Sequence, residues 1–196
     1  EKTESYTLKE KTLGVIGSGH IGKAVILKAA SLGMKVYVND IKPVPKYLQE
    51  LNNVEVTDFN FLLKNSNFIS LHCDLNSTSF HLISDKELKM MKSDTIIINT
   101  CRGEVIDQPA LENALEKEII FGAALDVFET EPLPNNSKLR KLDNIFLSPH
   151  NSNASPSVFN KVDKLSIQNL FSGIKDWGQM DGFTIYHNPR WGKSRQ

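Results

Sequence analysis

A glycine-rich turn near the start of the chain constrains the fold more than any other feature of the sequence. The turn is Gly17-Ser18-Gly19-His20-Ile21-Gly22, which follows a short apolar run and opens a segment with apolar residues at helical spacing. Glycines at Gly17, Gly19 and Gly22 let the backbone bend sharply, approach a pyrophosphate and pack the helix on the strand. Free N–H groups at the helix start attract the phosphates. The context predicts a dinucleotide site rather than a flexible glycine loop.

An acidic residue stands at the end of the next predicted strand. Asp40 follows the strand expected over residues 35–39, at about the 20-residue spacing that separates a glycine turn from its ribose-binding acid. A carboxylate at this place hydrogen-bonds the adenosine ribose hydroxyls and repels a 2′-phosphate. The sequence therefore predicts NAD, rather than NADP, as the cofactor.

The chain continues as an alternation of predicted strands and helices. We expect strands over residues 12–16, 35–39, 54–56, 68–71, 95–99, 119–127 and 144–147, and helices over residues 20–32, 59–64, 85–91, 108–117 and 156–174. This order predicts an α/β fold with a doubly wound parallel sheet of the Rossmann type, followed by a C-terminal helix and tail. We expect a dinucleotide-binding domain over residues 1–172 and a tail over residues 173–196.

Composition excludes several classes of function. The 23 basic and 23 acidic residues balance, so the totals favour no nucleic acid and no anionic membrane as a partner. The apolar runs are shorter than a membrane span. Two cysteines in 196 residues are too few for a disulfide framework. We therefore expect a cytoplasmic protein without a membrane segment and without a metal site.

Three polar clusters, around Arg102, Glu131 and His150, each lie just past a predicted strand. A parallel sheet would gather them at one edge, although spacing alone equally fits solvated loop charges and a structural histidine. Hydride reduction of a 2-oxo acid needs a cation for the carboxylate, which Arg102 suits by its bidentate geometry. It also needs an acid for the developing alkoxide, which His150 suits. Glu131, hydrogen-bonded to the other ring nitrogen, would fix the tautomer and favour the protonated ring.

From about Lys11 to His150 the chain resembles the D-isomer-specific 2-hydroxyacid dehydrogenases. The resemblance is carried by the stretches KTLGVIGSGHIGKAV, LISDKELKMMKSDTIIINTCRGEVID, GAALDVFETEPL and NIFLSPH. It implies NAD-dependent interconversion of a D-2-hydroxy acid and its 2-oxo acid. It also implies that Arg102 anchors the carboxylate and oxo group of the substrate, and that Glu131 and His150 transfer the proton. Glutamate at position 131 argues against formate as the substrate, whereas phosphite stays open.

The same resemblance implies the cofactor contacts. His20 and Ile21 would meet the pyrophosphate, and Asp126 would lie near the nicotinamide, which Thr100 and Cys101 would line by backbone contacts. The family also implies a homodimer. Because this family places most of its substrate domain before the glycine turn, we expect that portion to be missing from a chain that begins at Glu1.

The two cysteines raise separate questions. The segment around Cys73, Leu71-His72-Cys73-Asp74-Leu75-Asn76, resembles the branch that contains the C-terminal-binding-protein corepressors. Cys73 would then contact the cofactor, although a small residue ending a strand fits equally well. The alternative function is an NAD-sensing, corepressor-like binding module. For Cys101 we expect a small side chain in a tight slot rather than a redox role, because no CxxC motif or resolving partner is visible.

Overall fold

The computed structural model describes residues 7–152 and 155–175. Its strands are β1 (Thr12–Ile16), β2 (Lys35–Asn39), β3 (Val54–Val56), β4 (Phe68–Leu71), β5 (Ile96–Asn99), β6 (Gly122–Leu125) and β7 (Ile145–Leu147). Its α-helices are α1 (His20–Ser31), α2 (Lys46–Gln49), α3 (Phe59–Asn65), α4 (Asp85–Leu88), α5 (Gln108–Glu116) and α6 (Pro156–Lys175), and its 3-10 helices are η1 (Leu8–Glu10), η2 (Gly103–Val105) and η3 (Lys138–Lys141).

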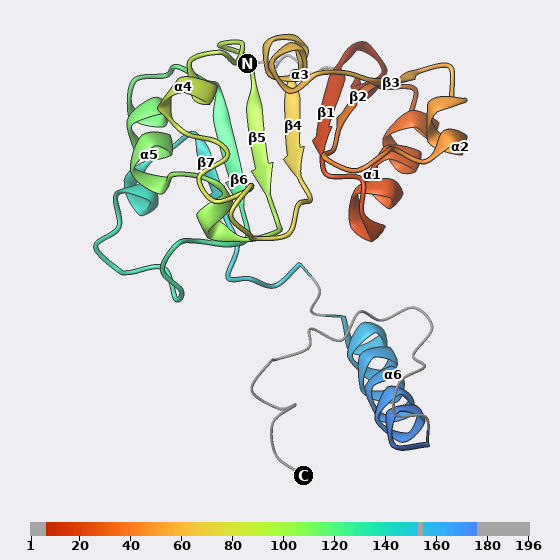
Figure 1. The fold of residues 1–196 in the computed structure, drawn as a ribbon. Coiled ribbons are helices and arrows are strands. Elements are labelled where there is room, and N and C mark those ends of the chain that lie inside the picture. Colours follow the sequence, from red (N-terminus) through yellow and green to blue (C-terminus); the bar gives the residue numbers. More distant parts are fainter. Residues whose placement is uncertain (1–6, 153–154, 176–196) are drawn as a thin grey trace. The chain divides into compact units, whose positions relative to one another are not determined.

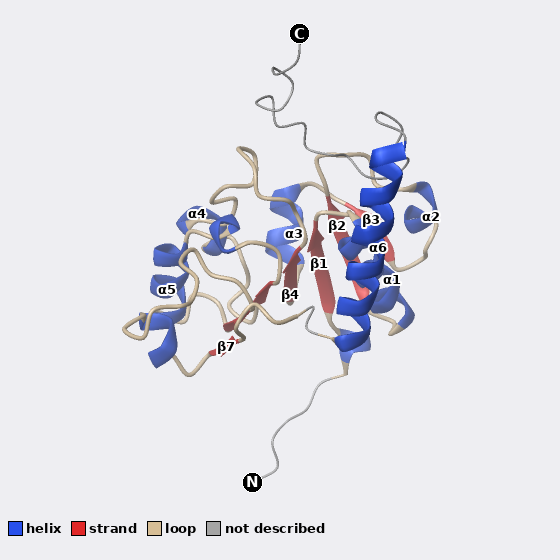
Figure 2. Cartoon of the chain, turned by 90° about the horizontal axis from the view of Figure 1, so that it is seen from below, coloured by secondary structure: helices blue, strands red, loops and turns tan. Residues whose placement is uncertain are grey.

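Within the described residues the strands form one parallel sheet in the order β3-β2-β1-β4-β5-β6-β7. The order reverses between β1 and β4, which is the point where doubly wound sheets bind their ligands. Helices α1 and α2 lie at the β1–β3 end, and α4 and α5 lie at the β5–β7 end (Figure 1). The view from below shows the same arrangement (Figure 2). The predicted α/β fold class is confirmed.

Two buried clusters hold the helices on the sheet, because successive strand residues point to opposite faces. Val15 and Val36 belong to the same cluster as Ile26 of α1, whereas Ile16 belongs to the other cluster with Leu62 of α3. Burying a side chain of this size contributes about 1.5–3 kcal/mol relative to leaving it exposed. Both faces of β1 are therefore covered, so its carboxyl end, where the glycine turn begins, is held rigidly.

Most predicted elements are present, and the differences lie at their ends. The predicted strand 119–127 is confined to Gly122–Leu125, because β5, its partner, pairs only from Ile96 opposite Gly122 to Asn99 opposite Leu125. The predicted helix 85–91 ends at Leu88, although its capping box at Ser84 is formed as expected. The short helix α2 was missed, and it buries Leu48 beside β3.

The chain divides into two compact units, residues 1–152 and residues 153–196. The sheet and the candidate site lie in the first unit. The described part of the second unit is α6, which matches the helix expected over residues 156–174. The predicted domain boundary at residue 172 stays a prediction, and most of the predicted tail lies outside the described residues.

Candidate active site

The glycine turn joins β1 to α1 through close backbone contacts. Gly17 has a φ of +93°, a left-handed conformation that glycine adopts without strain. A Cβ at Gly17 would lie 2.6 Å from the carbonyl oxygen of His72, and a Cβ at Gly22 would collide with the carbonyl oxygen of Gly17. A Cβ at Gly19 would meet no atom within 4 Å. The turn is therefore closed on the protein side and open at Gly19.

The open side of the turn is suited to an anion. Gly19 is the N-cap of α1 and provides no side-chain cap, so the first N–H groups of a 12-residue helix have no such partner. The first turn of α1 also contains no acidic residue that would repel a phosphate. His20 and Ile21, the predicted pyrophosphate contacts, occupy the start of this helix and are exposed.

Asp40 closes the other side of the turn. Its Oδ2 accepts hydrogen bonds from the backbone N–H of Ser18 at 2.5 Å and from the Ser18 hydroxyl at 2.8 Å. Its Oδ1 accepts one from the backbone N–H of Lys42 at 2.8 Å. Partial burial alone would raise the pKa of Asp40, but the hydrogen bonds from Lys42 and Ser18 outweigh it and lower the pKa. The carboxylate is therefore ionised and fixed beside the turn.

A cavity of about 350 Å³ opens beside the turn. Its walls include Gly17, Gly19, Asp40, His72 and Cys73. Burial lowers the pKa of His72 to about 4, so this ring is neutral at physiological pH. A cavity that joins the open glycine backbone to the ribose-binding acid fits the adenosine and pyrophosphate part of NAD. The predicted cofactor residues of β1, β2 and β4 thus share one cavity.

Arg102 is presented by a turn that the Asn99 side chain holds. The Oδ1 atom of Asn99 accepts from the backbone N–H of Cys101 at 3.0 Å, and its Nδ2 donates to the carbonyl oxygen of Arg102 at 2.8 Å. Asn99 is 1% exposed, whereas Arg102 is exposed and donates to the carbonyl oxygen of Cys101. In the described part of the chain no carboxylate forms a salt bridge with Arg102. The guanidinium is therefore available to an anionic ligand.

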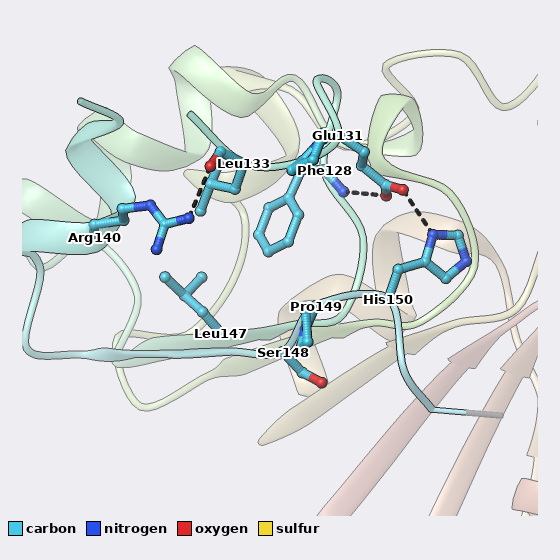
Figure 3. A pocket seen from close by; sticks show the side chains of 9 residues that line it. Phe128, Glu131, Leu133, Arg140, Leu147, Ser148, Pro149 and His150 are labelled. Carbon is cyan, nitrogen blue, oxygen red and sulfur yellow. Dashed lines mark hydrogen bonds and ion pairs between the residues drawn. The ribbon is translucent and has the colours of Figure 1, made fainter. Parts of the chain in front are cut away.

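Glu131 and His150 form a hydrogen-bonded pair. The Nδ1 atom of His150 lies 2.7 Å from Oε2 of Glu131, and Oε1 of Glu131 accepts from the backbone N–H of Phe128 at 3.0 Å. Figure 3 shows the ring turned so that its second nitrogen points away from Glu131 and Phe128. His150 has a φ of +52°, a conformation in which histidine is enriched among the non-glycine residues. One ring nitrogen is therefore engaged, and the second, Nε2, is presented outward.

Electrostatics keep the Glu131 carboxylate ionised. Partial burial would raise the pKa of Glu131, but the contacts with His150 and with the N–H of Phe128 and the charge of Arg102 together lower it. A cavity of about 550 Å³, with walls that include Phe128, Leu133 and Leu147, adjoins the pair (Figure 3).

Asp126 anchors the loop that carries His150. Its side chain is 4% exposed, and its two oxygens accept hydrogen bonds from the backbone N–H groups of Asn151 at 2.8 Å and Ser152 at 2.9 Å. Burial would raise the pKa of Asp126, but these bonds and the hydroxyls of Ser148 and Ser152 outweigh it and lower the pKa to about 2. The carboxylate therefore fixes the backbone immediately after His150. Its predicted place near the nicotinamide stays a prediction.

Two further contacts, which the sequence analysis did not identify, bring the loops together. A Cβ at Gly103 would collide with the backbone of Phe128, so the loops of Arg102 and Glu131 lie back to back. Glu129 Oε1 lies 2.8 Å from His81 Nε2 and also accepts from the backbone N–H of Gln108 at 3.0 Å. The glycine after Arg102 was a visible signal, whereas no local spacing pairs His81 with Glu129.

All the predicted site residues except His20, Ile21 and Gly22, which begin α1, follow the carboxyl end of a strand. Because the strands are parallel, Thr100, Cys101 and Arg102 after β5, Asp126 after β6 and His150 after β7 lie along the same edge as the glycine turn. The described residues contain no group of three or more His, Cys, Asp or Glu side chains that would hold a metal ion. No helix among them is both long and apolar enough to cross a membrane.

The fold and the glycine turn define a Rossmann-type dinucleotide-binding domain. Residues 1–152 match the family described as D-isomer specific 2-hydroxyacid dehydrogenase, NAD binding domain. The chain belongs to this family, as its motifs indicated.

Three relatives illustrate the likeness. The chain is 44% identical over 170 residues to a glyoxylate reductase of Thermococcus litoralis, covering 87% of this chain and 51% of that protein. It is 44% identical over 151 residues to a D-3-phosphoglycerate dehydrogenase of Methanocaldococcus jannaschii, covering 76% of this chain and 28% of that protein. The NAD-complexed structure of a D-isomer specific 2-hydroxyacid dehydrogenase from Lactobacillus delbrueckii ssp. bulgaricus aligns with a TM-score of 0.82 at 28% identity, covering 92% of this chain and 58% of that one. The chain thus spans about half the length of the glyoxylate reductase that it matches.

Proposed function

We propose that this chain is the cofactor-binding part of an NAD-dependent D-2-hydroxyacid dehydrogenase. The observation that carries the proposal is the hydrogen bond between His150 Nδ1 and Glu131 Oε2, at 2.7 Å, on the same sheet edge as the glycine turn. A histidine held by a carboxylate and presenting its second nitrogen outward is the arrangement of a general acid and base.

The residues of the chain divide the chemistry between them. Arg102 binds the carboxylate of the substrate, since its guanidinium has no carboxylate partner in the described residues. His150 donates a proton from Nε2 to the oxo oxygen as that oxygen gains charge during reduction, and it recovers the proton in the reverse reaction. Glu131 holds Nδ1 and stabilises the charged ring. Bound NAD(H) supplies or accepts the hydride.

The cofactor is held at the carboxyl edge of the sheet, on the side of the glycine turn. Gly17, Gly19 and Gly22 admit the pyrophosphate to the N-terminus of α1, where His20 and Ile21 lie, and Asp40 binds the adenosine ribose. Cys73 lines the same cavity. We assign Thr100, Cys101 and Asp126 to the nicotinamide side. Their places after β5 and β6, beside Arg102 and next to the strand that precedes His150, support this assignment.

Glyoxylate is the first substrate to examine, since a relative that is 44% identical to this chain over 170 residues is a glyoxylate reductase. A phosphorylated hydroxy acid is the second, because another relative is a D-3-phosphoglycerate dehydrogenase. A homodimer belongs to the same proposal, supported by the family. A cytoplasmic location also belongs to it, supported by the two free cysteines, which are typical of a reducing compartment. The relatives reported above are named as enzymes, and none of them supports the corepressor-like module.

The test uses the protein encoded by the complete open reading frame that contains this chain. Oxidation of NADH is followed at a series of concentrations of glyoxylate, hydroxypyruvate, pyruvate and 3-phosphohydroxypyruvate, with formaldehyde as a control that lacks a carboxylate. Turnover of one 2-oxo acid, and none of formaldehyde, is the expected result. Tight NADH binding without turnover of any acid would contradict the proposal.

A further inference from the structure

The two cysteines of the chain follow neighbouring strands at the carboxyl edge of the sheet. Cys73 lies just past β4 and Cys101 just past β5. These strands pair in parallel, and Leu71 lies opposite Asn99 at the end of the ladder. Cys73 and Cys101 each follow this last pair by two residues, so both leave the same end of the ladder. Two side chains that are far apart in the sequence are therefore neighbours in the fold.

The sulfur atoms share one small environment. The Cys101 thiol donates to Oδ1 of Asn99 at 3.1 Å, and the Cys73 side chain is its electrostatic neighbour across the ends of the two strands. Both cysteines are half-buried, pack against the same hydrophobic cluster and are free thiols. Cys73 also lines the cavity that contains Gly17 and Asp40. Cys73 is therefore reachable from the cofactor cavity, and Cys101 lies beside it and is itself only partly buried.

The surroundings of the two sulfurs distinguish them. The interaction with Cys73 contributes most to lowering the pKa of Cys101, and the backbone N–H groups of Arg102 and Cys73 and the guanidinium charge of Arg102 act in the same direction against burial. The contact with Cys101 and burial both raise the pKa of Cys73. Cys101 therefore ionises first while Cys73 stays protonated beside it, which is the relation between an attacking and a resolving thiol.

We infer that Cys73 and Cys101 form a dithiol that reacts with hydroperoxides and closes to an intramolecular disulfide. The Cys101 thiolate attacks the O–O bond of hydrogen peroxide, so that an S–O bond forms, the O–O bond breaks and water leaves after taking up a proton. The sulfur of Cys73 then attacks the sulfenic acid, the S–O bond breaks, and a second water leaves with the proton of the thiol. In sum, two thiols are oxidised and one peroxide is reduced to two waters.

The modification would alter the wall of the cofactor cavity, because Cys73 belongs to that wall. The oxidation of the two thiols does not depend on the proposed dehydrogenase activity, since the reaction needs only the thiols and the peroxide. Bound NADH would cover the cavity and slow the reaction. A low-molecular-weight dithiol would reverse it.

The experiment treats the 196-residue chain with one equivalent of hydrogen peroxide and counts free thiols with time. The expected result is a fall from two thiols to none, with a tryptic peptide pair joined through Cys73 and Cys101. On a denaturing, non-reducing gel the protein should still migrate as a single chain. Saturating NADH should slow the loss of free thiols about tenfold, and dithiothreitol should restore both thiols. Because the chain contains only two cysteines, an intramolecular disulfide has one possible assignment.

Two matched variants separate the roles of the sulfurs. Cys73→Ser should leave a sulfenic acid on Cys101 that dimedone traps, and Cys101→Ser should react about tenfold more slowly than the unmodified chain. Joined chains, a sulfinic acid without a disulfide, or thiol loss no faster than in the urea-unfolded chain would each overturn the inference. All three of these contrary outcomes are measured on the unmodified chain, so the test remains decisive even if a variant fails to fold.

Discussion

The two ends of the candidate site are built differently, although both lie at the carboxyl edge of one sheet. At the glycine turn the contacts are made by the backbone, since the Cβ position of Gly22 is occupied by the carbonyl oxygen of Gly17. At the proton-transfer end they are made by side chains, since Glu131 reaches from the loop after β6 to His150 after β7. The first region therefore tolerates no added atom at Gly17 or Gly22, and the second tolerates no lost functional group.

This difference separates stability from chemistry. A methyl group added at Gly17 or Gly22 would force backbone segments apart and lower the stability of the folded state. The pair of Glu131 and His150 is partly exposed, with 35% and 45% of the side-chain surface accessible, so little packing depends on it. Substitutions there should change the rate and leave the fold intact.

The largest expected effect is at His150. In the complete protein, His150→Asn should lower kcat for 2-oxo acid reduction by about 10²–10⁴-fold, because the proton donor is lost. Asparagine tolerates the left-handed backbone at this position, so the loop should keep its conformation. Steady-state kinetics measure kcat, and fluorescence titration should give an unchanged Kd for NADH. A kcat equal to that of the unmodified protein would remove His150 from the chemistry.

The next effect is at the turn. Gly22→Ala should lower the free energy of unfolding by about 3 kcal/mol, because the new methyl group meets the carbonyl oxygen of Gly17, which is backbone and cannot rotate away. The matched control is Gly19→Ala, whose methyl group meets nothing within 4 Å and should change stability by less than about 0.5 kcal/mol. Urea denaturation measures both variants. Equal stability of the two would contradict the difference between closed and open sides.

A smaller effect, at the proton-transfer end, depends on pH. The pKa of Asp126 in the fold is about 2, below its ordinary value of 3.8, so the carboxylate contributes stability above about pH 4 that is lost as the pH falls towards 2. The contribution is about 2 kcal/mol. Asp126→Asn should lose it at pH 7 and show a flatter acid profile in urea denaturation.

An exposed acid supplies the control for the pH experiment. Asp94→Asn changes the same chemical group at a surface salt bridge with Lys92, and its acid profile should follow that of the unmodified chain. If Asp126→Asn were destabilised equally at pH 7 and at pH 2, the hydrogen bonds to Asn151 and Ser152 would not be the source of the effect.

The smallest expected effect concerns cofactor choice. Asp40→Asn should raise the affinity for NADPH relative to NADH by about tenfold, or roughly 1.4 kcal/mol, because the charge that repels the 2′-phosphate is removed. Titration of both cofactors by fluorescence measures the ratio, and Asp85→Asn, which changes a charge on α4, serves as the control. An unchanged ratio would show that Asp40 acts only through its hydrogen bonds to Ser18 and Lys42.

Local patterns were sufficient to predict most of the fold. The glycine turn, the apolar strands and the capping residues at Ser84 and Asp107 each act within a few residues, so their structural consequence is visible in the sequence. Strand ends were predicted less well, because β6 extends only as far as its partner β5 pairs with it. The buried turn of α2 at Leu48 lacked a long periodic pattern and was missed.

The sequence by itself determined the fold class, the family and the residue types of the site, because short-range spacing encodes them. Only the tertiary structure decided which of those residues meet. The hydrogen bond of Glu131 to His150 and the anchoring of the His150 loop by Asp126 both cross between strands. The parallel pairing of β4 with β5 likewise brings the segments of Cys73 and Cys101, which are far apart in the sequence, to the same end of the sheet. Contacts between the ends of parallel strands depend on the sheet, which no local pattern of residues contains.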